Sequence, residues 1–160
     1  MSGMNGHEKF LRMAIDLATT NVTSGAGGPF GAVVVKDGEV VAIGVNQVTA
    51  NNDPTAHAEV TAIRNACARL GAFQLSGCTI YSSCEPCPMC LTAILWARCD
   101  GLVFGSTASD AAEAGFDDSF FYEQVRLRTH ERELATENLL RDEARVSFET
   151  WCRTSEKVEY

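Results

Sequence analysis

Three side chains that bind soft metals occur together with one free carboxylate in this chain. His57-Ala58-Glu59 supplies an imidazole and the carboxylate, and Pro86-Cys87-Pro88-Met89-Cys90 supplies two thiols. One imidazole and two thiolates give a zinc ion three protein ligands and leave its fourth tetrahedral position to water, as catalytic zinc sites require. Zinc makes such a water nucleophilic near neutral pH, so we expect Glu59 to act as the acid/base of a hydrolysis.

Both motifs are predicted to lie at helix N-termini. Asp53-Pro54 is typical of an N-cap followed by proline at the first helical position, which predicts a helix over Ala56–Leu70 with His57 and Glu59 in its first turn. Side chains in a first turn tilt toward the N-terminus, so both can reach a point beyond the helix end. Cys87 and Cys90 are three residues apart at the start of a second predicted helix, Cys87–Ala97, where the helix dipole favours thiolates.

Cys84 allows two alternative interpretations of the metal site. Cys84, Cys87 and Cys90 have the spacing that begins an iron–sulfur motif, but the next cysteine of that motif is absent because residue 94 is isoleucine. A closed structural zinc site with Cys84 as the fourth ligand is the other alternative. In that case Glu59 would have no chemical task.

The remaining pattern predicts an α/β domain with three layers, α/β/α. Apolar residues at helical spacing predict a first helix over residues 8–21, and Asp37-Gly38 between two β-branched runs predicts a hairpin. Strands that alternate with helices predict parallel pairing with helices on both faces of the sheet. The predicted strands are Ala32–Val35, Val40–Val45, Thr79–Ser83 and Leu102–Phe104.

We expect residues 1–160 to form a single domain, because the chain contains no repeat, linker or low-complexity tract. The C-terminal third is harder to interpret: residues 132–146 fit either a helix or a strand. Residues 148–160 are most simply a terminal helix that carries Trp151.

Composition restricts the partners. The formal net charge is -8, and residues 109–160 hold seven basic against thirteen acidic residues, which opposes binding to a phosphate backbone. A small uncharged substrate fits this charge better than a nucleic acid.

We find no apolar run long enough for a membrane span and no export signal, so the expected location is the cytoplasm. The seven cysteines are then expected to be thiols or metal ligands.

The His-x-Glu and Pro-Cys-x-x-Cys motifs together are the pattern of zinc-dependent nucleobase deaminases. With four further segments, the chain closely resembles the bacterial guanine deaminases of the cytidine deaminase superfamily over most of residues 8–123. These segments are Gly27-Gly28-Pro29-Phe30-Gly31, Asn46, Asn52-Asp53-Pro54-Thr55-Ala56-His57 and Ala111-Ala112-Glu113-Ala114-Gly115-Phe116-Asp117-Asp118.

The resemblance implies a five-stranded mixed sheet with helices on both faces, and a homodimer whose C-terminal segments are exchanged. It also implies roles for individual residues around the site. Asn46 and the Ala58 backbone would contact the purine, Phe30 and Trp96 would enclose its ring, Tyr160 would cap the partner's pocket, and Asp118 would be a second proton shuttle.

The expected activity is zinc-dependent hydrolytic deamination of guanine to xanthine and ammonia. His57, Cys87 and Cys90 would bind Zn²⁺, with Glu59 as the acid/base. Guanosine and the amino-triazine ammeline are alternative substrates, because one or two pocket contacts decide such preferences. A tRNA adenosine deaminase should have a basic terminal helix, whereas this end is acidic. A protein of another class, a noncatalytic zinc-stabilised interaction module, is a further alternative. In such a module Glu59→Gln should have no measurable effect.

Overall fold

The computed structural model describes residues 6–160. The described chain divides after Ser119 into two parts, of which the first contains the sheet and the second consists of Phe120–Tyr160. Among the described helices, none combines the length and the apolar character needed to cross a membrane.

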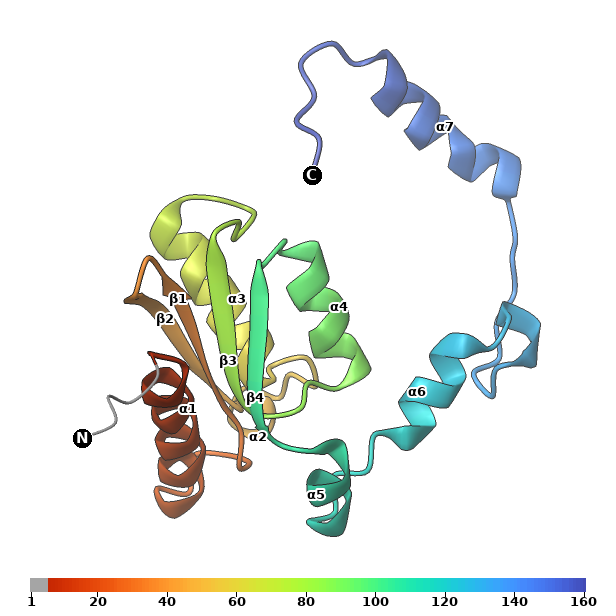
Figure 1. The fold of residues 1–160 in the computed structure, drawn as a ribbon. Coiled ribbons are helices and arrows are strands. Elements are labelled where there is room, and N and C mark those ends of the chain that lie inside the picture. Colours follow the sequence, from red (N-terminus) through yellow and green to blue (C-terminus); the bar gives the residue numbers. More distant parts are fainter. Residues whose placement is uncertain (1–5) are drawn as a thin grey trace. The chain divides into compact units, whose positions relative to one another are not determined.

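The first part is built on a mixed sheet with strand order β2-β1-β3-β4 (Figure 1). β1 pairs antiparallel with both β2 and β3, and β3 pairs parallel with β4. The strands are β1 (Gly31–Lys36), β2 (Glu39–Val45), β3 (Cys78–Cys84) and β4 (Gly101–Ser106). All four strands expected from the sequence are therefore confirmed, and the β3–β4 pair has the predicted parallel direction.

The expected fifth strand is not found among residues 6–160, where the sheet has four. The chain after β4 turns into helix instead. The Thr107 hydroxyl accepts from the Asp110 backbone N–H while the Asp110 carboxylate accepts from the Thr107 N–H, a capping box that starts α5 (Ala108–Glu113). The mixed α/β class and its helices on both faces of the sheet are nevertheless as predicted.

The predicted hairpin joins β1 and β2. Asp37 and Gly38 have φ values of 51° and 80°, the left-handed conformations that a two-residue type I′ turn requires. Alternating residues of β1 then point to opposite faces of the sheet. Ala32 and Val34 belong to one apolar cluster, and Val33 and Val35 belong to another.

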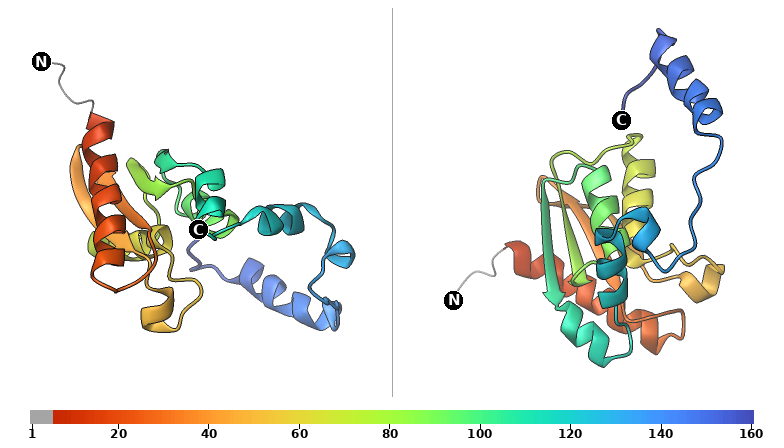
Figure 2. Two further views of the ribbon diagram at one scale, coloured as in Figure 1. Left: turned by 90° about the horizontal axis from the view of Figure 1, so that it is seen from below. Right: turned by 90° about the vertical axis from the view of Figure 1, so that its right-hand side faces the viewer.

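The two apolar clusters lie on opposite faces of the sheet, each between the sheet and a layer of helices. α1 (Gly6–Thr23) packs on one face of the sheet through Phe10 and Ala14, against Val33, Val35 and Tyr81. α3 (Ala58–Leu70) and α4 (Pro88–Trp96) cover the other face, as the two further views also show (Figure 2). Their fully buried residues include Ala62 and Ala66, whose small side chains let the helix approach the sheet closely.

The start of α3 differs from the sequence prediction. Its N-cap is His57, not Asp53, and Pro54 lies outside the helix. The Asp53 carboxylate instead accepts hydrogen bonds from the Thr55 backbone N–H and hydroxyl at 2.8 and 2.7 Å, which makes a local turn. Glu59 still lies in the first turn. A short helix that the sequence did not predict, α2 (Val48–Asn51), precedes this turn.

The second part of the chain is helical. It contains α6, which begins at the boundary (Ser119–Arg126), the 3-10 turn η1 (Thr129–Glu131) and α7 (Arg141–Arg153). The terminal helix therefore begins before residue 148 and ends at Arg153, so the prediction of a helix over residues 148–160 is wrong in both bounds. Trp151 does lie on it.

Candidate metal centre and active site

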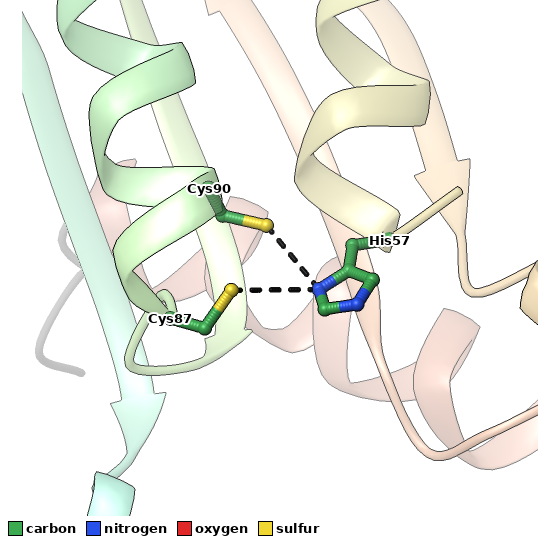
Figure 3. A group of neighbouring side chains, drawn as sticks. All are labelled: His57, Cys87 and Cys90. Carbon is green, nitrogen blue, oxygen red and sulfur yellow. Dashed lines mark hydrogen bonds between the residues drawn. The ribbon is translucent and has the colours of Figure 1, made fainter. Parts of the chain in front are cut away.

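His57, Cys87 and Cys90 meet in space although the histidine and the thiols come from segments about thirty residues apart (Figure 3). Each Sγ lies 3.5 Å from His57 Nδ1. The three ligand atoms all lie within 4.8 Å of one another, and they form the only such group of three or more among residues 6–160.

This donor set fits zinc. With a Zn–S bond of about 2.3 Å and a Zn–N bond of about 2.05 Å at a tetrahedral angle, nitrogen and sulfur would lie about 3.6 Å apart. The observed separation of 3.5 Å between Nδ1 and each Sγ agrees with that value. One nitrogen and two sulfurs are also the donors that zinc prefers over harder cations.

Two helix N-termini bring these side chains together. His57 is the N-cap of α3 and Cys87 is the N-cap of α4, each in an extended conformation just before its helix. Pro88 occupies the first position of α4, where its missing N–H costs nothing. Cys90 follows one turn along and is fully buried. The three side chains therefore converge, because both helices begin at the same end of the sheet.

The cluster is poised to bind a cation. The hydrogen bond from Cys90 lowers the pKa of the Cys87 thiol to about 4, and the same bond raises the pKa of Cys90 well above its usual range. The pKa of His57 is raised, mainly by its hydrogen bond with Cys87. Without metal, the two sulfurs thus share one proton, which a divalent cation would displace.

Cys84 is not part of this cluster. Its Sγ donates to the Thr107 carbonyl at 3.6 Å, and burial raises the pKa of the thiol to about 11. Cys84 does not join the group of three ligand atoms found among the described residues. The geometry therefore favours three protein ligands over a closed site with four.

Glu59 lies beside the cluster with 4% of its surface exposed. Its Oε1 accepts a hydrogen bond of 2.8 Å from the Ser82 hydroxyl of β3. Burial raises the pKa of the carboxyl group, and the bond from Ser82 opposes that rise. A buried carboxyl group with a raised pKa can hold and release a proton, which suits it to general acid/base catalysis.

Three of the residues expected to contact substrate lie at the ends of β1, β2 and α3. Phe30 immediately precedes β1, Asn46 immediately follows β2, and Ala58 is the first residue of α3. Asn46 and Phe30 are joined directly, because the Asn46 N–H donates to the Phe30 carbonyl at 3.1 Å. Ala58 is completely buried and directly follows the ligand His57.

Asp118 belongs to the segment between α5 and α6. Burial raises the pKa of its carboxyl group, and the negative charge of Cys87 raises it further, so Asp118 is in electrostatic reach of the metal cluster. The same segment reaches Phe30: the Phe116 and Phe30 rings make an edge-to-face contact with centroids 5.0 Å apart.

Trp96 and Tyr160, the other two expected substrate contacts, both have largely exposed side chains. Trp96 is the last residue of α4, six residues beyond Cys90 and hence about 9 Å along the helix axis, and 65% of its surface is exposed. Tyr160 belongs to the second part of the chain and is 72% exposed.

The sequence interpretation missed Ser82, whose hydroxyl holds Glu59. A signal for it exists, because Ile80, Ser82 and Cys84 alternate along one face of β3, and a serine in a buried run needs a hydrogen-bond partner. It also missed Asn21, a buried polar residue of α1.

Comparison with known proteins agrees with this geometry. Residues 4–106 match the family described as "Cytidine and deoxycytidylate deaminase zinc-binding region". The chain is 53% identical to the guanine deaminase of Bacillus subtilis over 154 residues, which cover 96% of this chain and 99% of that protein. It is 35% identical to the tRNA-specific adenosine deaminase of Haemophilus influenzae over 156 residues, covering 95% and 88%.

The fold agrees as well. The X-ray structure of guanine deaminase from Bacillus subtilis superposes with a TM-score of 0.94 at 53% identity, and the match covers 98% of this chain and 99% of that one. The likeness therefore extends over both parts of the chain.

Proposed function

We propose that this chain, which belongs to the cytidine and deoxycytidylate deaminase family of zinc-binding enzymes, hydrolyses guanine to xanthine and ammonia. It is a zinc-dependent aminohydrolase. The observation that carries the choice of guanine is the likeness to the guanine deaminase of Bacillus subtilis, which extends over nearly the full length of both proteins at 53% identity.

In this proposal His57, Cys87 and Cys90 hold the zinc ion. When bound, zinc supplies a Lewis acid that makes water nucleophilic near neutral pH. The separations of 3.5 Å between Nδ1 and the two Sγ atoms support these three residues as its ligands. The absence of Cys84 from the described cluster supports an open fourth position.

Glu59 would move the protons. Ser82 holds its carboxylate through Oε1, and the carboxylate can accept a proton from the attacking water. Glu59 would deliver that proton to the ring nitrogen beside the attacked carbon and then help to protonate the departing amine. Asp118 would act as a second shuttle near the amino group, which is supported by the raised pKa of its carboxyl group, caused by burial and then by the charge of Cys87.

Asn46, Phe30 and the Ala58 backbone would bind the purine. Their support is that the Asn46 N–H is hydrogen-bonded to the Phe30 carbonyl and that Ala58 directly follows the ligand His57. The contact of Phe30 with Phe116 would hold one aromatic wall. The role of Trp96 as a second wall rests on the family resemblance alone, since it lies at the far end of α4.

We further propose a homodimer with exchanged C-terminal segments, in which Tyr160 of one copy caps the site of the other and each copy's residues 1–160 act as one functional domain. In the single chain, α7 has no buried residue, and several large apolar side chains of residues 120–160 are more than two-thirds exposed. Such a surface normally has a partner. These residues are Leu134, Leu139, Leu140, Phe148 and Tyr160.

A substrate panel tests the proposed reaction. The zinc-loaded protein would be assayed for ammonia release from guanine, guanosine, cytidine, cytosine, adenine and ammeline. We expect guanine to have the highest kcat/KM. Faster turnover of guanosine or ammeline would identify that compound, and not guanine, as the substrate. No ammonia release from any of the six compounds would favour the noncatalytic interaction module.

A tRNA adenosine deaminase remains the second candidate, because the Haemophilus influenzae relative matches 95% of this chain. Charge argues against it: residues 109–160 hold seven basic and thirteen acidic residues. Salt-sensitive retention of the protein on tRNA, together with inosine formation, would favour this candidate over guanine deamination.

A further inference from the structure

Asn21 is a buried polar residue on α1 that the proposed chemistry does not use directly. It is 4% exposed, and its Nδ2 donates two hydrogen bonds, to the Gly28 carbonyl at 2.8 Å and to the Asn46 carbonyl at 2.9 Å. Both hydrogens of one amide group are therefore used to join two separate segments. One segment leads into β1 through Phe30, and the other leaves β2 at Asn46.

The backbone of Asn21 completes this junction. Its carbonyl accepts from the N–H groups of Ala26 and Gly27 at 3.0 and 3.2 Å, so the turn after α1 is bound to the same residue. Gly27 fits closely there: a Cβ at this position would lie 2.3 Å from the Asn46 carbonyl oxygen. The turn and the end of β2 thus touch backbone to backbone, with Asn21 as the side chain between them.

This junction fixes how the Asn46 side chain is turned. Its Oδ1 accepts from the backbone N–H groups of Gly28 and Val48, both at 3.4 Å. Because both neighbours are donors, the atom that faces them must be the oxygen. The Nδ2 of Asn46 is then the group directed elsewhere, and it can only donate.

We infer that Asn21 is a positioning residue for substrate binding, which acts by holding Asn46 and the Gly28–Phe30 segment in register. The inference rests on the proposed function, in which Asn46 and Phe30 contact the purine. A donor at Asn46 requires an acceptor on the ligand, and guanine offers two adjacent acceptors at O6 and N7. Loss of Asn21 releases Asn46 and Gly28 together, so binding suffers more than the chemical step at Glu59.

The test is a double-mutant cycle on the zinc-loaded enzyme, with Asn21→Ala, Asn46→Ala and the double variant. We expect Asn21→Ala to raise KM about ten-fold, with less than about a two-fold change in kcat and unchanged zinc content. In the Asn46→Ala background, Asn21→Ala should raise KM by no more than about two-fold, because the group it positions is already absent. Equal increases in KM in both backgrounds would overturn the inference.

Thr23→Ala is the matched control, because it removes an exposed hydrogen bond from the same helix end without touching Asn46. If Asn21→Ala does not fold, Asn21→Ser takes its place in the cycle, since its hydroxyl retains one donor. Failure of both variants to fold would identify Asn21 as a purely structural residue and would also overturn the inference.

The wild-type protein separates this inference from the proposed function. If wild type does not deaminate guanine but deaminates another amino-heterocycle, the proposed substrate is wrong and the same cycle is measured with that heterocycle. Coupling between Asn21 and Asn46 would then still support the positioning role. Activity of wild type without coupling would remove the positioning role alone.

Discussion

Ser82 and Glu59 are joined by a buried hydrogen bond of 2.8 Å between the centre of the sheet and the first turn of α3. Both residues are almost completely inaccessible to solvent. The carboxylate beside the three metal ligands is therefore held by an inner strand of the sheet and not by a loop. This support should matter more for the reaction rate than for substrate binding.

Replacement of Ser82 by alanine should lower kcat about ten-fold and leave KM nearly unchanged, because Glu59 loses the bond that orients Oε1. Steady-state kinetics with guanine measures both constants. Ser83→Ala is the matched control: its hydroxyl lies on the next residue of β3 and accepts from the Gly31 N–H, away from Glu59. Equal losses in the two variants would mean that the effect is general destabilisation of the strand.

Glu59→Gln should abolish most turnover while zinc content and fold persist. The amide cannot carry the proton from water to the ring, and loss of a general acid/base typically costs about 10²- to 10⁴-fold. Ammonia release, metal analysis and circular dichroism together check this prediction. Unchanged turnover would show that the carboxylate has no catalytic role.

The metal-free protein should show a pH dependence of stability that Glu59→Gln reduces. Burial raises the pKa of Glu59 above its ordinary value of 4.5, so the folded chain retains a proton where the unfolded chain has lost it. Stability must then fall as pH rises above about 4.5, because burying the ionised carboxylate is costly. Thermal unfolding of both proteins is measured in the presence of a chelator over a range of pH. As pH increases, the stability of wild type should fall relative to that of Glu59→Gln. A difference in stability that does not change with pH would contradict a raised pKa of Glu59.

Gly44→Ala should destabilise the fold by about 2 kcal/mol or more, because α3 lies directly against β2 at this point. A Cβ on Gly44 would lie 2.2 Å from the Ala58 carbonyl oxygen and 2.4 Å from the Ala62 backbone nitrogen. Since Ala58 separates His57 from Glu59, zinc affinity should fall as well. Chemical denaturation and metal titration measure the two effects, and Gly6→Ala, which meets nothing within 4 Å, is the control.

Deletion of Tyr160 should raise KM for guanine and leave zinc content unchanged, because the proposed cap does not contact the ligand set. Kinetics on the truncated chain, with its oligomeric state measured by sedimentation, checks this prediction. Kinetics identical to those of wild type in an intact dimer would remove the capping role of Tyr160.

The metal cluster could be predicted from the sequence because short-range geometry determines it. His57, Cys87 and Cys90 each lie within one turn of a helix start, and side chains there tilt toward the same end of the helix. The exact helix start was not predictable in the same way. Asp53-Pro54 has the composition of a helix start, but its carboxylate binds Thr55 in a turn and His57 takes the cap.

Hydrogen bonds between residues far apart in the sequence could not be predicted from it. Ser82 is 23 residues from Glu59, and Asn21 is 25 residues from Asn46, so no local spacing relates either pair. The segment over residues 132–146 carried mixed charged and apolar residues that fit two periodicities, and the structure puts the start of α7 inside it. The expected fifth strand came from the family resemblance and not from a strand pattern in this chain.

The ligands and Glu59 stand on helix starts braced by the sheet, whereas Phe30, Asn46 and Asp118 stand on connecting segments. In the proposed function, Phe30 and Asn46 contact the purine from connecting segments, while the zinc ligands and Glu59 lie on helix starts. Exchanging the two segments that carry Phe30 and Asn46 should therefore change the preference among amino-heterocycles without displacing the zinc ligands or Glu59.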